Sequence, residues 1–228
     1  MAAVQADKAM QADKAMQTDK MIQSLAAQLR PVRPLHSALL RALLWLAVVG
    51  SIAGLLIAHT VGLGIFLQRV AVARVAVETA ATALTAITAV IAAFELSVPG
   101  RSPRWAVLPV LPFLTWLGAS GLGCLANGLS LHGDAGFSGE SPHCFAFITG
   151  VSVPLGLGLF WMLRRARPIA PLPVAALGTL GVAATAAFLL QFFHPFDVTV
   201  IDLALHLAAI ALVVLVGTAW RRPLLAAA

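Results

Sequence analysis

Six long apolar runs, separated by short polar segments, dominate the pattern of hydrophobic and polar positions along this chain. Each run is close to the roughly 20 residues that cross a bilayer core as an α-helix. Because backbone groups left unpaired in lipid are costly, helices are the expected structure for runs of this length. The runs lie at about Leu43–Val61, Val75–Phe94, Trp105–Cys124, Cys144–Leu163, Leu172–Phe193 and Val198–Trp220.

The pattern therefore predicts an all-α membrane protein with a six-helix transmembrane domain over residues 42–221. Composition agrees, because the chain is 60% hydrophobic and 11% charged with a mean hydropathy of +0.93, whereas about a quarter of the residues in an ordinary globular domain are charged. Small residues recur in the runs, as in Gly50–Gly54 and Gly178–Gly181. These positions should let neighbouring helices approach closely.

Basic residues predict the orientation of the helices. Of the 15 lysines and arginines, all except Arg69 and Arg74 fall on one side of the predicted membrane if the N-terminus is cytoplasmic. This bias predicts an inner-membrane protein with both termini in the cytoplasm. The same side holds four of the tryptophans, whose rings favour the membrane interface: Trp45, Trp105, Trp161 and Trp220. The net charge of +6 does not indicate direct nucleic-acid binding, because the basic residues are not gathered on one soluble domain.

The first 17 residues form a low-complexity leader. Residues 5–22 read QADKAM, QADKAM and QTDKMI, a hexapeptide repeat whose last copy has diverged. A step of six residues turns a helix by about 600°, so successive methionines do not build one apolar face. We expect the leader to be solvated and the repeats before Thr18 to be dispensable.

Residues 18–36 form a separate cytosolic segment. Thr18 can cap a helix and Asp19 suits its positive end. The helix should carry an apolar stripe and end at Pro31, and the arginine- and proline-containing segment after it should be extended. A helix of about twelve residues is marginal alone in water, so this one needs a surface to fold against. The candidate binding residues are Met21, Ile22, Leu25, Leu29, Arg30, Val32, Arg33 and Leu35.

The loop between the third and fourth predicted helices lies on the opposite side of the membrane and is bounded by Cys124 and Cys144, with His132 and His143 between them. Two cysteines facing an oxidising compartment favour a structural disulfide. The same residues are also suited to a redox switch or to transient binding of a soft heavy-metal ion. The spacing matches no dedicated zinc motif, so both alternatives stay open.

Other polar residues lie inside the predicted helices. Asp202 and His206 are four residues apart and can form a hydrogen-bonded pair near the outer end of the sixth helix. His59 and Glu78 lie near the outer ends of the first and second helices, and Glu95 should reach the cytoplasmic interface. No phosphate-binding loop, nucleophile elbow or HExxH motif is present in the sequence, so we predict that the protein is not an enzyme and needs no resident cofactor.

Several separated motifs together resemble the NrsF family, the negative regulators of sigma F. They are TDKMIQSLAAQLRPVRPL, ELSVPGRSPRW, GLGC, HCFAFITGVSVPLGL, MLRRARPIAP, and FHPFD followed by Asp202 and His206. The resemblance implies an anti-sigma factor that holds an extracytoplasmic-function sigma factor at the membrane. It further implies that the residues 18–36 bind the sigma factor, with Arg30 and Arg33 pairing with its acids, and that Cys124 and Cys144 receive a stress signal. The repeated leader departs from the family pattern.

Two functions from different classes remain open at this point. The first is the anti-sigma factor, which would release its partner on an extracytoplasmic metal or oxidative signal. The alternative is a small membrane redox protein or metal transporter that uses Cys124, Cys144, Asp202 and His206. The transporter is less favoured, because no charged residue falls at the predicted midplane to mark an ion path.

Overall fold

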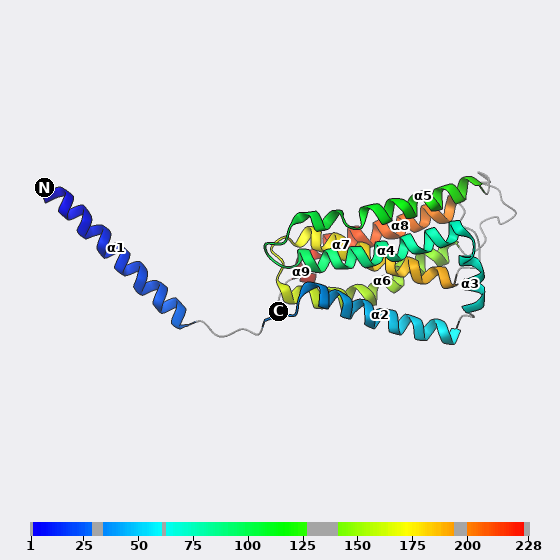
Figure 1. Ribbon diagram of the computed structural model, residues 1–228, viewed down its shortest axis with the longest axis horizontal. Coiled ribbons are helices and arrows are strands. Elements are labelled where there is room, and N and C mark those ends of the chain that lie inside the picture. The colour runs from blue at the N-terminus through cyan, green and yellow to red at the C-terminus, as the bar shows by residue number, and fades with distance from the viewer. Residues whose placement is uncertain (1, 29–33, 61–62, 127–140, 194–199, 226–228) are drawn as a thin grey trace. The chain divides into compact units, whose positions relative to one another are not determined.

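The computed structural model describes residues 2–28, 34–60, 63–126, 141–193 and 200–225 (Figure 1). The chain divides into two compact units, Met1–Leu35 and His36–Ala228. The first unit contains one helix, α1, at Ala2–Ala27. The second unit is a bundle of helices, and each unit is described here by itself.

Six helices of the bundle are long and apolar enough to cross a membrane, which confirms the prediction of six spans. These spans are 20 to 24 residues long. The shorter elements are α3 (Leu63–Val70), the 3-10 turns η1 (Pro103–Val107) and η2 (Arg164–Ala166), and α9 (Arg221–Leu225). The long helices are α2 (Ala38–Thr60), α4 (Ala73–Leu96), α5 (Val110–Ala126), α6 (Ser141–Leu163), α7 (Pro171–Phe193) and α8 (Val200–Ala219).

Helix α7 forms the centre of the bundle. It is the most buried of the six spans, and it packs against α4, α6 and α8. Close packing depends on its small residues, because a Cβ added to Gly181 would lie 2.7 Å from Val90 Cγ2 and 3.0 Å from the Val90 backbone nitrogen. At Gly178 the nearest atom would be Leu159 Cδ2, at 3.3 Å. The expected role of Gly178 and Gly181 in close helix packing is therefore confirmed.

Helix α2 lies at the edge of the bundle and packs mainly against α4. A Cβ added to Gly50 or Gly54 would meet nothing within 4 Å in the part of the chain that the structure describes. The expectation that these two glycines bring helices of the bundle together is therefore wrong. Both are exposed on the bundle surface, because α2 meets its neighbours mainly through its first two turns, at Ala38, Arg41, Ala42 and Trp45.

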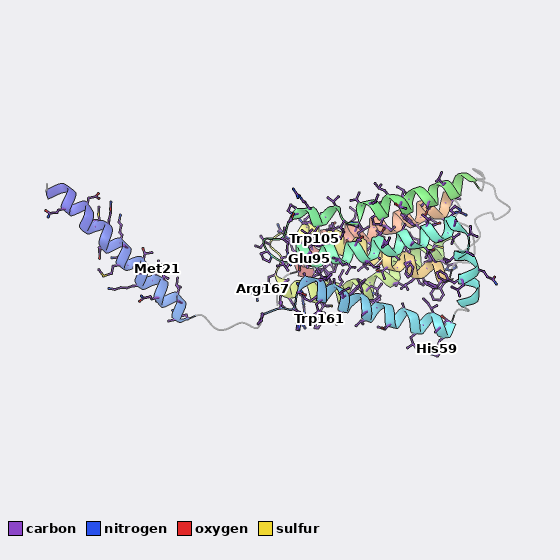
Figure 2. The ribbon with its side chains drawn as sticks, in the orientation of Figure 1. Met21, His59, Glu95, Trp105, Trp161 and Arg167 are labelled. Atoms are coloured by element: carbon purple, nitrogen blue, oxygen red, sulfur yellow. The ribbon has the colours of Figure 1, made fainter. Side chains whose placement is uncertain are left out.

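One end of the bundle, which we call the basic end, is formed by η1, η2, α9 and the first turn of α2 (Figure 1). Trp105 and Trp161 lie at this end with Glu95 and Arg167, whereas His59 lies at the opposite end (Figure 2). Helix α3 also lies at the opposite end; its residues fall between the first and second predicted spans, where no helix was predicted. Arginine and tryptophan side chains therefore lie together at the basic end, next to the apolar surface of the long helices.

Candidate functional site

Helix α1 carries the first candidate site. The side chains of Met21, Ile22 and Leu25 are 62%, 58% and 58% exposed. They follow one another at one- and three-residue steps near the end of the helix, so they form a short apolar patch on it. Leu35 is also exposed. The remaining predicted binding residues lie outside the described part of the chain: Leu29, Arg30, Val32 and Arg33.

The predicted start of this helix at Thr18 is wrong. Helix α1 begins at Ala2 and runs through the hexapeptide repeats, and the Thr18 hydroxyl donates to the Lys14 carbonyl at 2.8 Å as in a helix interior. The repeats consist largely of good helix formers, Ala, Gln, Lys and Met. Their period also places hydrogen-bonding partners four residues apart, with Gln11 donating to Asp7 and Gln17 to Asp13 at 3.3 Å. Over its full length α1 has no apolar face, as the period of six predicts.

At the basic end, a buried polar cluster joins the start of α2 to the end of α4. The Ser37 hydroxyl accepts from the Leu40 backbone N–H at 3.3 Å and so caps α2. One turn later, Arg41 is buried, donates from Nη2 to Ser97 Oγ at 3.5 Å, and lies over the Phe94 ring at 5.4 Å. Its Nε and Nη1 have no hydrogen-bond partner among the described residues.

Glu95 belongs to the same cluster. Its carboxylate is buried, and Arg101 Nε lies 3.1 Å from Glu95 Oε2. Glu95 was expected to reach the membrane interface, and it does lie at the end of α4, but its side chain points into the protein. Sequence alone did not predict that the charge of Glu95 would act on arginines from two segments, because this depends on which face α2 presents to α4.

The cysteine site is described only in part. Cys144 is buried in the first turn of α6, beside Ile148 and Ala187. Cys124 lies in the last turn of α5, but its side chain and the loop that holds His132 fall outside the described residues. His143 is exposed. Among the described residues no group of three His, Cys, Asp or Glu side chains is placed to hold a metal ion, so the predicted disulfide or metal-binding pair stays a prediction.

Asp202 and His206 lie one turn apart on α8. Asp202 is buried, and His206 Nδ1 is 2.6 Å from the backbone carbonyl oxygen of Asp202. Since a carbonyl can only accept, Nδ1 carries the proton in this arrangement. The structure thus places the His206 ring against the Asp202 backbone, and the predicted pairing of the two side chains stays a prediction.

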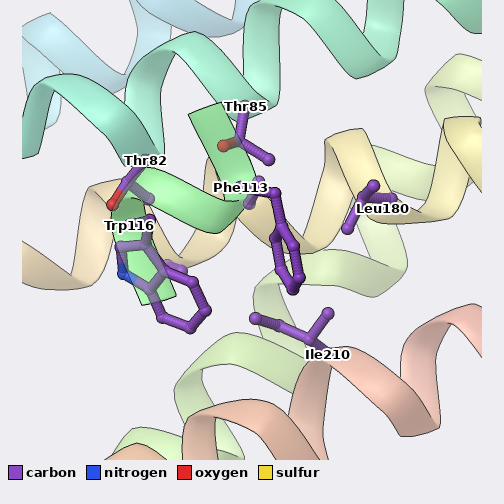
Figure 3. A pocket seen from close by; sticks show the side chains of 8 residues that line it. Thr82, Thr85, Phe113, Trp116, Leu180 and Ile210 are labelled. Carbon is purple, nitrogen blue, oxygen red and sulfur yellow. The ribbon is translucent and has the colours of Figure 1, made fainter. Parts of the chain in front are cut away.

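A polar stripe on α4 was not foreseen. Glu78 Oε1 accepts from the hydroxyl of the buried Ser120 on α5 at 2.8 Å, and Thr82 accepts from Gln191 of α7 at 3.2 Å. Thr82 and Thr85 also line a cavity of about 10 Å³, room for roughly one water molecule. Phe113, Trp116, Leu180 and Ile210 close the cavity (Figure 3), so its walls are almost entirely apolar. It is too small to be a substrate site.

The comparisons with known proteins identify the class of protein. A family model described as NrsF, negative regulator of sigma F, matches residues 25–226. This chain belongs to the NrsF family. Neither a curated protein nor a solved structure matches it. Since NrsF proteins are negative regulators of a sigma factor and not enzymes, the chain is a regulatory membrane protein whose partner is a sigma factor.

Membership of the NrsF family separates the parts of the chain that belong to the shared domain from those that do not. The matched range begins at Leu25 and includes both cysteines, Asp202 and His206. It leaves out the hexapeptide repeats, the last of which contains Met21 and Ile22, although the structure joins them to Leu25 in one helix. The repeats are thus a feature of this chain that the NrsF family model does not cover.

Proposed function

We propose that this protein is an anti-sigma factor that holds an extracytoplasmic-function sigma factor at the bacterial inner membrane. The apolar patch of Met21, Ile22 and Leu25 carries the proposal. Helix α1 has no apolar face over its full length, but these three large apolar side chains are exposed close together near its end. An exposed apolar group of this kind is typical of a surface that a partner covers. Leu29, Val32 and Leu35 extend this contact, and Arg30 and Arg33 pair with acids of the sigma factor.

The proposed orientation places the basic end of the bundle and both termini in the cytoplasm. Arginines and interfacial tryptophans at one end of the bundle support it. This orientation also brings the residues 18–36 to the side of the membrane where a sigma factor meets RNA polymerase. Reporter fusions at Arg167 and in the 127–140 loop test it, with a cytoplasmic signal expected only from the first.

Release is proposed to begin at Cys124 and Cys144, with His132 and His143 between them in sequence. An extracytoplasmic metal ion or oxidant acts on this pair and shifts the bundle between two arrangements. A tenfold change in sigma-factor release needs only about 1.4 kcal/mol of difference between those arrangements. Support comes from the positions of the cysteines, which end α5 and begin α6, the two helices joined by the intervening loop.

Transcript profiling of a deletion strain tests the proposed function. We expect deletion to raise one set of transcripts that share a sigma-factor promoter, and a Leu25→Asp strain to raise the same set. The metal content and thiol status of the cell should stay unchanged in the absence of stress. A change in metal content or thiol status without altered transcription would instead support the redox or transport function.

A further inference from the structure

The segments at the basic end share a composition that the fold does not require. Each combines arginine with proline, in Arg101-Ser102-Pro103-Arg104, Arg167-Pro168 and Arg222-Pro223, and residues 96–109, 163–173 and 219–228 contain no Asp or Glu. Five of their arginines are exposed, and we call these the arginine collar: Arg101, Arg104, Arg165, Arg167 and Arg222. Since Glu95 is buried, every charged side chain exposed on these segments is cationic.

Two arginines of the collar are held in place by side-chain contacts. The guanidinium of Arg101 is fixed 3.1 Å from the buried Glu95 carboxylate. The guanidinium of Arg165 lies 3.8 Å from the centre of the Trp161 ring. Prolines further restrict the backbone next to Arg104, Arg167 and Arg222. The guanidinium groups of Arg101 and Arg165 therefore have little conformational freedom to lose when a partner binds.

Arg167 occupies a backbone conformation that costs stability. Its φ and ψ are 48° and 63°, in the left-handed region, and its backbone N–H donates to the Arg164 carbonyl to close the turn after η2. For a residue with a Cβ this conformation costs about 1 kcal/mol, whereas glycine adopts it freely. Two residues later Ile169 is 81% exposed. Glycine would be more stable than arginine at position 167, and the neighbouring Ile169 side chain is exposed. Together these two features indicate that Arg167 has a binding role.

We propose that the arginine collar is a second docking surface for the sigma factor, which contacts an acidic face of that protein. This inference rests on the proposed function, and it adds an interface on the bundle to the one on α1. Lipid headgroups would also attract arginines. Because headgroups are mobile, however, their binding does not become stronger when the arginines are held at fixed positions, and it would not offset the unfavourable backbone conformation of Arg167. A folded protein with acids at fixed positions does gain from them.

Binding of the purified sigma factor identified by the transcript profile tests the collar. The full-length protein is placed in phosphatidylcholine nanodiscs, with and without phosphatidylglycerol. We expect Arg167→Glu to weaken binding roughly tenfold in both lipids and to reduce the salt dependence of the affinity. Arg69→Glu, in α3 at the opposite end, is the matched control and should bind as the wild type does.

A second variant distinguishes the effect of the lost charge on binding from an effect on the stability of the fold. Arg167→Gly removes the charge but relieves the backbone, so it should raise the thermal unfolding midpoint and still weaken binding. The inference is overturned if both Arg167 variants bind like the wild type, or if they lose affinity only in phosphatidylglycerol. If the wild-type protein binds no sigma factor at all, the proposed function fails. If only Leu25→Asp loses binding, the proposed function stands and the collar does not.

Discussion

Glu95 Oε2 lies 3.1 Å from Arg101 Nε, with the carboxylate buried and the guanidinium about half exposed. The preceding residue, Phe94, carries the buried guanidinium of Arg41 over its ring at 5.4 Å. The buried Arg41 also experiences the negative charge of Glu95, so this carboxylate acts on arginines from two different segments. Through its contacts with Phe94 and Ser97, Arg41 ties the start of α2 to the end of α4.

Replacing Glu95 should destabilise the bundle. Glu95→Gln keeps the shape of the side chain but leaves Arg41 buried without a nearby negative charge, so we expect a loss of about 2 kcal/mol in the free energy of unfolding. Arg101→Gln should cost less, and the coupling energy of the pair should stay near 1 kcal/mol because Arg101 is partly solvated. Thermal unfolding in nanodiscs measures both. Asp19→Asn, on the exposed surface of α1, is the control, and an unchanged midpoint for Glu95→Gln would contradict the structural role.

Packing of α7 on α4 predicts that Gly181 tolerates no side chain. In Gly181→Ala the new Cβ would meet Val90 Cγ2 at 2.7 Å and the Val90 backbone nitrogen at 3.0 Å, so a helix must shift. We expect a loss of about 1–3 kcal/mol. Gly50→Ala is the matched control, because its Cβ meets nothing within 4 Å among the described residues. Equal unfolding midpoints for the two variants would show that α7 and α4 are not packed this closely.

Because α1 runs through the hexapeptide repeats, we now expect the first two copies to strengthen sigma-factor binding and not to be dispensable, since they extend the helix that carries the apolar patch. Deleting residues 5–16 leaves a helix of marginal length, so we expect several-fold weaker binding, about 1 kcal/mol. A helix-forming replacement of equal length should restore the affinity, whereas a Gly/Ser replacement should not. Circular dichroism and binding of the purified sigma factor measure the two effects. Full affinity with the Gly/Ser replacement would show that the repeats are dispensable.

The proposed sensing role predicts that Cys124→Ser/Cys144→Ser represses normally but no longer responds to stress. Serine cannot form a disulfide and binds soft metal ions poorly. Basal transcription of the regulon should match the wild type, which controls for folding of the variant, while induction by cadmium or an oxidant is lost. Induction at the wild-type level in this double variant would remove the cysteines from the release mechanism.

Sequence patterns predicted the six spans well, because length and hydropathy decide whether a segment crosses a membrane. The predicted fifth span, Leu172–Phe193, differs from α7 by a single residue. Rules for helix ends failed where a residue can either cap a helix or lie inside a longer one. Thr18 is a good cap, but the residues before it also favour helix, so the helix continues through it. Helix α3 was missed because it is too short to give a clear period.

Only those parts of the candidate site that depend on the local sequence could be predicted. Exposed apolar residues at Met21, Ile22 and Leu25 follow from their place in a polar segment. The Arg41–Glu95–Arg101 cluster and the Glu78–Ser120 hydrogen bond join segments far apart in the sequence. Such contacts depend on the rotation of each helix about its axis, which hydropathy does not determine.

The most direct test of the central claim is the affinity of the purified sigma factor for the full-length protein in nanodiscs, compared between Leu25→Asp and Met10→Asp. The two side chains are similarly exposed on the same helix, at 58% and 54%, but only Leu25 belongs to the proposed interface. Placing a charge where a leucine should be buried against a partner is expected to weaken binding at least about tenfold, while Met10→Asp binds as the wild type does. Equal affinities for the wild type and both variants would contradict the account.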